Sequence, residues 1–301
     1  MTRTAAFVML LIVAPALPGI VVKTKALLSG RRGAPVFQAY YDLAKLLRKG
    51  AVYSRTTTWL FRAGPVGALA SLLVAALLLP LDGRAAILHF PGDLVAFAGL
   101  LAFGRFVLVL AALDTGSSFE GMGASREVTI GSFVEPALFL CFIALVLATG
   151  GLSLSDMLGA PLGGVWASAS ASLTLVGISL FVLLLAENAR VPVDDPATHL
   201  ELTMVHEVMV LDHSGADLAL IVYGSALKLA LFGTLVAGVF APRAHLGAAA
   251  ALALLAAVLF AVAVAVGVVE SVTARLRLAR VPQLLVGSAV LATFGVILLL
   301  R

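Results

Sequence analysis

Apolar runs, each about as long as a membrane is thick, recur along the whole chain and are separated by short polar stretches. A helix needs about 20 mostly apolar residues to cross the hydrocarbon core of a bilayer. Windows of this kind lie at 4–22, 64–80, 94–113, 131–149, 166–186, 218–240, 246–269 and 282–300. The pattern therefore predicts an all-α polytopic membrane protein with about eight transmembrane helices.

The polar connections between these windows are short. The longest, at 23–63, is too short to fold as a separate soluble domain with a hydrophobic core of its own. We therefore expect residues 1–301 to form a single integral membrane domain.

Composition supports the membrane interpretation and excludes other classes. Charged residues make up 12% of the 301 residues and hydrophobic residues 61%, whereas a typical soluble domain carries about 25% charged residues. This balance excludes an ordinary soluble enzyme and a disordered tail. We find no nucleophile-elbow motif, no Rossmann glycine pattern and no basic–aromatic nucleic-acid signature. We expect no catalytic residues in this chain and no nucleic-acid partner.

The basic residues are distributed unequally between the two sides of the predicted bundle. Fourteen of the 20 lie in loops on one side, nine of them in 23–63, and four lie on the other side. The positive-inside rule assigns the richer side to the cytoplasm and both termini to the outside. The span 4–22 has an alternative interpretation as a signal peptide, which the basic cluster after it disfavours. We expect a multi-pass protein of the inner (cytoplasmic) membrane.

An amphipathic helix is predicted within the longest connection, after Pro35. Apolar residues fall on one face of this segment and polar residues on the other, as in a helix that lies in the membrane interface. Two interpretations stay open, a lipid-surface anchor and a docking rim for a soluble partner. The apolar face carries Val36, Tyr40, Leu43 and Leu47, and the polar face carries Gln38, Asp42, Lys45 and Lys49.

A glycine-rich polar stretch, 113–127, precedes the fourth span. Its glycines would give the backbone freedom for close approach to another group, but the pattern of a phosphate-binding loop is absent. Glu135 lies just inside the following span, where an ionisable group is costly and therefore functional by default. The alternative for Glu135 is a structural ion pair with Arg105 or Lys228, the two basic residues inside predicted spans.

The stretch 187–217 concentrates ionisable residues. It holds seven of the 16 acids and three of the five histidines, spaced seven residues apart. A metal site would need ligands three or four residues apart, so we expect none. Interleaved apolar residues disfavour a fully solvated loop. Half-buried acids and histidines at a membrane surface favour proton relay, because burial shifts their pKa values.

The single cysteine, Cys141, lies in an apolar run. With no second cysteine, an intrachain disulfide, a CxxC redox pair and an iron–sulfur cluster are excluded. We expect no cofactor in this chain.

Three runs together resemble a known family. They are 31–47, 123–127 (Gly-Ala-Ser-Arg-Glu) and 187–196 (Glu-Asn-Ala-Arg-Val-Pro-Val-Asp-Asp-Pro), the last followed by His-Ser-Gly at 213–215. In this order they resemble the NADH dehydrogenase subunit 1 family of respiratory complex I. Within it, the match is closer to the membrane subunits of formate hydrogenlyase and related group 4 nickel–iron hydrogenases.

This resemblance implies a role. Members of the family anchor a soluble redox arm and link its chemistry to proton or sodium movement through antiporter-like membrane subunits. Iron–sulfur clusters and nickel–iron would belong to the soluble large and small subunits. The acid-rich loop would take part in coupling. Its family charged motif maps by position onto Glu187, Arg190, Asp194 or Asp195, Glu201 and Asp212.

The loop departs from complex I members at one point. It reads Val-Asp-Asp-Pro-Ala-Thr-His-Leu-Glu-Leu at 193–202, where complex I members usually carry a Phe-Asp-Leu-Pro-Glu-Ala-Glu type of run. This region borders the quinone cavity in complex I, so the departure favours the hydrogenase branch over quinone binding.

Our leading hypothesis is a non-redox membrane subunit of a hydrogenase-type, complex-I-like oxidoreductase, which is not catalytic alone. One alternative is a quinone-binding subunit of a NADH:quinone oxidoreductase. Another is a stand-alone ion or solute transporter, which the lack of an internal repeat disfavours. The proton-pathway candidates are Asp114, Glu135, Glu187, Asp194, Asp195, Glu201, Glu207 and Asp212. The counter-charges are Arg105, Arg190 and Lys228, and the docking candidates are Arg31, Arg32, Gln38, Lys45, Arg126 and Glu127.

Overall fold

A computed structural model describes residues 2–194, 204–243 and 246–300. Within these ranges the regular structure is helical, without a strand. The helices are α1 (Thr2–Val13), α2 (Ala16–Leu28), α3 (Gln38–Leu47), α4 (Trp59–Leu77), α5 (Asp93–Asp114), α6 (Ser118–Thr149), α7 (Leu154–Met157), α8 (Ala160–Glu187), α9 (Gly215–Phe240), α10 (Ala248–Val272) and α11 (Val281–Leu299), with short 3-10 helices η1 (Glu207–Val210) and η2 (Leu278–Arg280).

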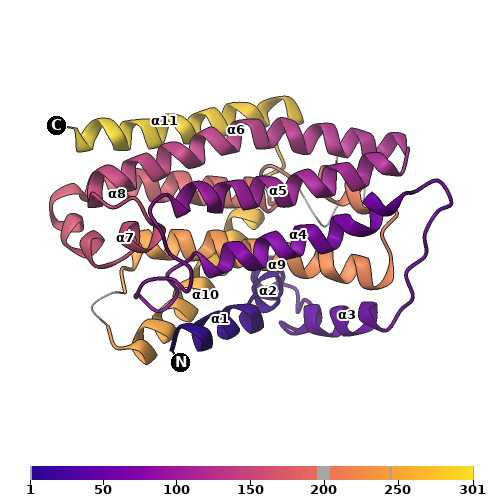
Figure 1. Ribbon diagram of the computed structural model, residues 1–301, viewed down its shortest axis with the longest axis horizontal. Coiled ribbons are helices and arrows are strands. Elements are labelled where there is room, and N and C mark those ends of the chain that lie inside the picture. The colour runs from indigo at the N-terminus through magenta and orange to yellow at the C-terminus, as the bar shows by residue number, and fades with distance from the viewer. Residues whose placement is uncertain (1, 195–203, 244–245, 301) are drawn as a thin grey trace.

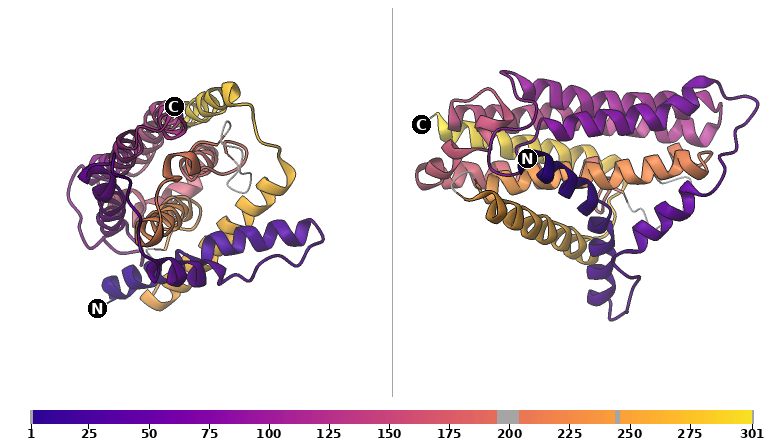
Figure 2. Two further views of the ribbon diagram at one scale, coloured as in Figure 1. Left: turned by 90° about the vertical axis from the view of Figure 1, so that its right-hand side faces the viewer. Right: turned by 60° about the horizontal axis from the view of Figure 1, so that its bottom comes forward.

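Seven helices of the described chain are long and apolar enough to cross a bilayer: α4, α5, α6, α8, α9, α10 and α11, the last counted together with η2. They run roughly along the long axis of the molecule (Figure 1). Helix α9 is the most enclosed, with 72% of its apolar window buried, whereas α10 and α11 have 28% buried. Viewed from one end, α9 lies near the centre of the bundle (Figure 2).

The first predicted span is a bent pair of helices rather than the straight helix expected at 4–22. Helices α1 and α2 meet at an angle of 44°, and α2 extends to Leu28. Pro15 lies at the break, where its missing N–H cannot bond to the carbonyl of Leu11. That carbonyl instead accepts a hydrogen bond from the hydroxyl of Tyr223 in α9 at 3.0 Å. The pair brings the count of spans to eight, as the sequence predicts.

Helix α6 begins earlier than expected. It has 32 residues, so most of the stretch 113–127 is helix rather than loop. A Cβ atom on Gly123 would come within 3.0 Å of the Val205 carbonyl and of the side chains of Val208 and Met209. The close approach expected at these glycines is therefore real, and the group that approaches is a later segment of this same chain.

Hydroxyl groups join α11 to the bundle. Ser179 in α8 and Ser288 in α11 lie 2.8 Å apart, and Ser172 donates to the carbonyl of Gly295 at 2.6 Å. Small residues and buried hydroxyls are typical of close helix contacts in membranes, where apolar packing alone does not select one partner.

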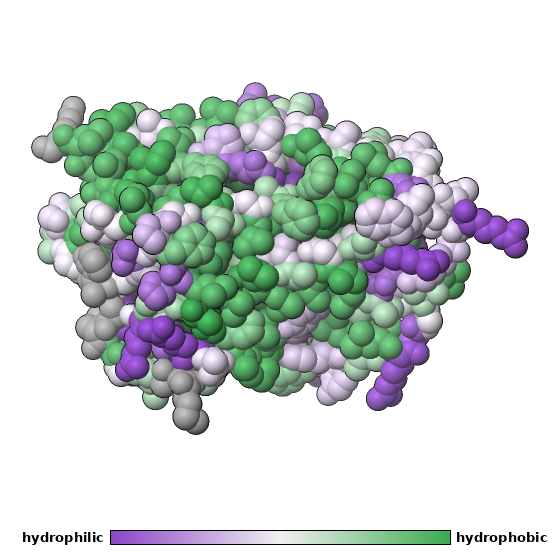
Figure 3. Space-filling model, viewed as in Figure 1, coloured by the Kyte–Doolittle hydropathy of each residue, from purple (hydrophilic) through white to green (hydrophobic). Residues whose placement is uncertain are grey.

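The surface has the pattern of a bilayer-spanning protein. Hydrophobic residues cover most of the face shown in Figure 3, and strongly hydrophilic side chains gather toward its two ends. The amphipathic helix expected in 23–63 is present as α3. It lies toward the end of the bundle away from the C-terminus, and both termini lie in the other half (Figure 1). Which end faces the cytoplasm stays a prediction.

Candidate functional site

Arg105, in the middle of α5, lies at the centre of a group of ionised side chains. Its guanidinium contacts Glu135 of α6 at 2.6 Å, forms a close ion pair with Glu187 at the end of α8, and lies 3.8 Å from the carboxylate of Glu127. The amine of Lys228 in α9 lies 3.4 Å from the other oxygen of Glu187. We call these five residues the charged cluster. It joins four membrane-spanning helices.

The sequence of α6 makes room for the guanidinium. Glu127, Gly131 and Glu135 are spaced four residues apart and therefore lie along one helical face. A Cβ atom on Gly131 would come within 2.2 Å of the Arg105 Nη1 atom. Because glycine has no side chain, the arginine can lie against α6 between two carboxylates. Gly131 is not among the residues predicted from the sequence, although the acid–glycine–acid spacing was a usable signal.

Burial makes the pairing of these charges necessary. The exposed fractions are 10% for the side chain of Arg105, 5% for Glu187 and 14% for Lys228, whereas Glu135 keeps 43%. Isolated charges in such surroundings cost several kcal/mol, and removing one partner of a buried pair costs about 3–5 kcal/mol. The cluster has three carboxylates and two cations. With all groups ionised it carries one excess negative charge, which a bound proton would neutralise.

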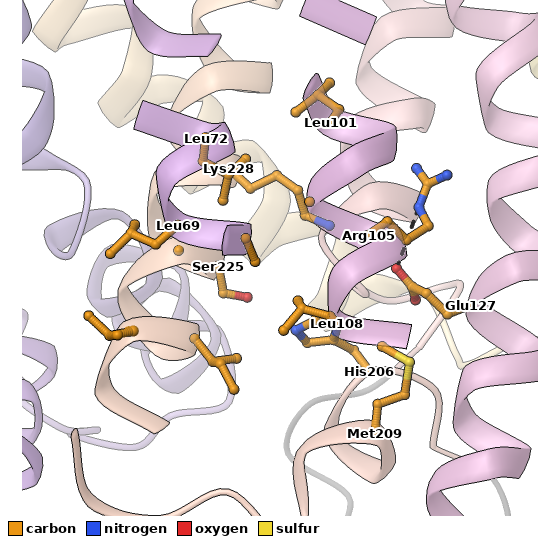
Figure 4. A pocket seen from close by; sticks show the side chains of 15 residues that line it. Leu69, Leu72, Leu101, Arg105, Leu108, Glu127, His206, Met209, Ser225 and Lys228 are labelled. Carbon is orange, nitrogen blue, oxygen red and sulfur yellow. Dashed lines mark ion pairs between the residues drawn. The ribbon is translucent and has the colours of Figure 1, made fainter. Parts of the chain in front are cut away.

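A small cavity of about 40 Å³ adjoins the cluster. Using about 10–15 Å³ per water molecule, it has room for a few waters. Arg105, Glu127 and Lys228 lie on its wall together with His206. Figure 4 shows Lys228 reaching across from α9 toward α5, with His206 and Met209 on the opposite side. Leucines of α4 and α5 complete the lining, so the few polar groups lie in largely apolar surroundings.

A larger cavity of about 470 Å³ lies on the other side of His206. Its ionisable lining residues are Arg190, His206, Glu207 and His213, Ser225 adds a hydroxyl, and most of the remaining wall is apolar. Pro18 of α2 and several residues of α9 also line this cavity. The large cavity is therefore an apolar space with a few ionisable groups.

The loop after α8 is anchored by its own polar residues. Asp194 forms an ion pair with Arg275 at 2.8 Å and accepts a hydrogen bond from the Val205 N–H at 2.9 Å. Arg126 of α6 donates to the carbonyl of Met204 at 2.8 Å. Met204, Val205, Val208 and Met209 are buried, so this part of the loop packs into the bundle, as the interleaved apolar residues indicate.

A second ion-pair group holds Arg190. Glu270, at the end of α10, contacts Lys25 of α2 at 2.9 Å and Arg190 at 3.6 Å. The glutamate side chain is 1% exposed. Arg190, predicted as a counter-charge, thus pairs with an acid that the sequence did not single out, because Glu270 lies at the end of an otherwise apolar run.

Two predicted residues have surroundings that differ from expectation. Asp114, expected in a proton pathway, accepts hydrogen bonds from Thr58 N at 2.6 Å, Thr58 Oγ1 at 2.8 Å and Phe61 N at 3.3 Å, and it therefore caps the start of α4. Glu127, expected at a docking surface, is buried and belongs to the charged cluster.

The remaining predicted residues fall into three groups. Arg31, Arg32 and Lys45 are exposed, and Gln38 donates to Asp42 at 3.0 Å on the same helix. Asp212 is exposed, whereas Glu207 is half-buried at the large cavity. Asp195 and Glu201 lie outside the described residues, as does His199.

Glu120 and His213 are two further buried polar residues, of which Glu120 was not predicted from the sequence. Glu120 is fully buried and accepts a hydrogen bond from the Asp212 N–H at 3.0 Å. The ring of His213 stacks on Phe61 with centroids 4.0 Å apart. Neither of its ring nitrogens has a hydrogen-bond partner in the described part of the chain. Burial lowers the pKa of His213 below its ordinary value, because the charged imidazolium would lose its hydration.

Among the described residues, no group of three or more His, Cys, Asp or Glu side chains is arranged to hold a metal ion. Cys141 is buried, and its thiol lies 3.2 Å from the Ser179 hydroxyl.

The fold defines the class to which the chain belongs. It is similar to a chain in the structure of the membrane-bound sulfane sulfur reductase, described as an archaeal respiratory membrane complex, with a TM-score of 0.82 and 20% sequence identity. The similarity covers 99% of this chain and 98% of that one. The chain thus shares its fold, over nearly its whole length, with a chain of that complex.

The family follows from the sequence comparisons. The model of the NADH dehydrogenase family matches residues 2–300, and the chain belongs to this family. Escherichia coli (strain K12) hydrogenase-4 component C is 34% identical over 238 residues, covering 78% of this chain and 73% of that protein. Formate hydrogenlyase subunit 4 of the same organism is 32% identical over 282 residues, covering 90% and 89%.

A subunit of the NADH-quinone oxidoreductase of Rubrobacter xylanophilus is 26% identical over 212 residues, covering 70% of this chain and 62% of that protein. The predicted family resemblance is therefore confirmed. The chain is a membrane subunit of the complex-I-like type, and the identity to the two hydrogenase-related proteins exceeds the identity to this NADH-quinone oxidoreductase component.

Proposed function

We propose that this chain is the integral membrane subunit of a hydrogenase-type, complex-I-like oxidoreductase, and that it couples redox chemistry in a soluble arm to proton or sodium movement. The observation that carries the proposal is the charged cluster. Three carboxylates surround Arg105 and Lys228 within the membrane-spanning bundle, beside a cavity large enough for water.

The excess negative charge of the cluster makes it sensitive to protonation. In a site of low effective dielectric, a change of one unit of charge alters ion-pair energies by several kcal/mol. Protonation of one carboxylate would therefore release Arg105 or Lys228 toward the acids that stay ionised. Because Arg105, Glu135, Glu187 and Lys228 lie on four helices, such a shift would be transmitted to helix packing. This arrangement can link proton uptake to a conformational change.

The relatives and the surface of the molecule support the proposed partners and location. We place soluble large and small subunits, carrying iron–sulfur clusters and nickel–iron, against the end of the bundle that holds α3, where Arg31, Arg32 and Lys45 are exposed. Antiporter-like membrane subunits would provide the ion path beyond this chain. The inner cell membrane is the location that suits such a complex, with the α3 end in the cytoplasm.

A quinone-binding role is the second candidate, and the large cavity favours it. A space of about 470 Å³ with mostly apolar walls and a few polar groups is typical of sites for amphiphilic ring compounds. Bound quinone in the purified complex, or inhibition of its turnover by quinone-site ligands, would support this role.

Co-purification with metal analysis is the first test of the leading proposal. A tagged copy extracted in mild detergent should bring down iron- and nickel-containing partners. Recovery of the chain alone, or ion flux through the chain alone in liposomes, would contradict the proposal and favour a stand-alone transporter.

The variant Glu135→Gln tests the role of the cluster. Glu135 is its most exposed member, and glutamine retains an oxygen that can accept from Arg105. We expect normal assembly and at least a tenfold decrease in ions moved per electron pair. The control is His89→Gln, whose side chain is exposed and lies outside the charged cluster. Loss of assembly in Glu135→Gln would identify a structural ion pair instead.

A further inference from the structure

His206 lies where the two cavities meet. The small cavity, beside the charged cluster, and the large cavity, beside Arg190 and His213, share the side chains of His206, Ile221 and Ser225. Ile221 and Ser225 are one turn apart on α9. Of the ionisable residues that line either space in the described chain, His206 alone lines both.

The surroundings of His206 combine burial with nearby acids. Glu127 of α6, Glu187 at the end of α8 and Asp194 of the loop raise its affinity for a proton, and Lys228 of α9 lowers it. Arg105 lines the same small cavity. Burial is the largest influence and lowers the pKa of His206 below its ordinary value. The ring is therefore neutral near pH 7, while three carboxylates can stabilise a short-lived imidazolium.

We propose that His206 is the proton-transfer residue that connects the large cavity to the charged cluster. This inference rests on the proposed coupling function and deepens it, since it identifies the route by which a proton reaches Glu127. One ring nitrogen accepts the excess proton of a protonated water in the large cavity, and the N–H of the other nitrogen releases its proton to the Glu127 carboxylate, which becomes a carboxylic acid. Rotation of the neutral ring then turns its N–H toward Glu127 again, so that the net change is one proton moved from the cavity water to Glu127.

The other groups at this junction cannot perform the step in the same way. The hydroxyl of Ser225 can orient water but does not hold an additional proton near neutral pH. Ile221 has no polar group. Arg190 and Arg105 each line one cavity only, and a guanidinium stays protonated. An imidazole has two nitrogens that exchange donor and acceptor roles, which suits a residue with a cavity on either side.

The test uses the intact complex reconstituted in proteoliposomes. We expect His206→Ala to assemble with its partners and to lower proton movement per electron pair at least tenfold. Added imidazole should restore a measurable part of that movement, because it can occupy the space of the missing ring. His206→Gln, which keeps polarity and approximate size, should be equally impaired and should not respond to imidazole.

His89→Ala serves as the matched control, because this histidine is exposed and lies outside both cavities. It should behave as wild type with and without imidazole.

Three results would overturn the inference about His206. They are undiminished proton movement in both His206 variants, impaired movement in His206→Ala that imidazole does not restore, and failure of both variants to assemble, which would make His206 a structural residue. If Glu135→Gln is impaired while the His206 variants are not, the route is wrong and the coupling function stands. If the wild-type complex moves no ions, the coupling function itself is contradicted.

Discussion

Two glycines of α6 determine what can lie beside this helix. Gly123 allows the segment 205–209 to approach, and Gly131 leaves the space that the guanidinium of Arg105 occupies. The carboxylates at 127 and 135 then contact the arginine from either side of Gly131. The acids provide charge, but the missing side chain determines where the charges meet.

Gly131→Ala should therefore disrupt the cluster without removing a charge. The added Cβ would lie 2.2 Å from Arg105 Nη1, a distance that no packed side chain tolerates, so the arginine must move away from its carboxylates. We expect a loss of about 1–3 kcal/mol in stability, as for other overpacked sites, seen as a lower melting temperature of the detergent-solubilised complex. Coupled ion movement should decrease as well.

Gly99→Ala is the matched control for this variant. Gly99 lies in α5 and is exposed, and a Cβ atom added there would meet no heavy atom within 4 Å. Equal melting temperatures for the two variants would show that Gly131 does not position Arg105.

The buried His213 should make the packing of the loop before α9 dependent on pH. Its pKa is lowered by burial when the ring is packed on Phe61, and it returns toward about 6.5 when the segment opens. Packing of the neutral His213 ring therefore stabilises this segment fully above about pH 6.5, and the stabilisation decreases as the pH falls below that value. Hydrogen exchange of residues 208–214, corrected for intrinsic rates, should accelerate between about pH 7.5 and 5.5.

His213→Phe should keep the ring stacking and abolish this dependence. An unchanged pH response in His213→Phe would assign the effect to another group, such as Glu120, whose carboxylate accepts the Asp212 N–H.

At the scale of elements, breaks and starts of helices depend on distant polar groups. The carbonyl freed by Pro15 is satisfied by Tyr223 of α9, and the next carbonyl, of Ile12, accepts from the hydroxyl of Tyr40 in α3. Likewise, Asp114 at the end of α5 caps the start of α4. Each contact joins two different helices, so these side chains contribute to the assembly of the bundle.

Asp114→Ala should loosen the start of α4. Three hydrogen-bond donors would lose their acceptor, and loss of a cap costs about 1 kcal/mol. Limited trypsin digestion should cut after Arg55, in the exposed segment before α4, several times faster than in wild type. Asp42→Ala, an exposed acid in α3, should show no such change. If Asp114→Ala instead reduces ion coupling and leaves the rate of digestion unchanged, the result would support a role for Asp114 in the proton pathway.

At the scale of the whole molecule, the uneven distribution of charge indicates an orientation. Fourteen of the 20 basic residues lie between the apolar windows on one predicted side. An even number of crossings also agrees with the position of both termini in the same half of the bundle (Figure 1). The positive-inside rule therefore predicts that the α3 end faces the cytoplasm.

Single introduced cysteines can test this orientation. Native Cys141 is fully buried and should not react. A Cβ atom added to Gly50, next to α3, would meet no heavy atom within 4 Å, and Leu300, after α11, is 69% exposed. A membrane-impermeant maleimide should label Leu300→Cys on intact spheroplasts and should label Gly50→Cys only after permeabilisation. The opposite labelling pattern would reverse the orientation.

The sequence by itself determined the class, the spans and the family. Apolar length is a local property that bilayer thickness dictates, and the amphipathic period of α3 is equally local, so both could be predicted without knowledge of helix packing. The motifs at 123–127 and 187–196 were sufficient to indicate the family. Even the pairing of Glu135 with Arg105 was among the alternatives, since a buried charge requires a partner.

Only the tertiary structure decided which groups meet. The Arg105 ion pairs join residues 30 and 82 positions apart, and the choice of partner depends on the rotation and depth of each helix, which apolar runs do not specify. For that reason Glu127 lies in the cluster rather than at a docking surface, Asp114 caps a helix, and Glu270 pairs with Arg190. Membrane burial requires that charges be paired, and helix packing determines the pairs.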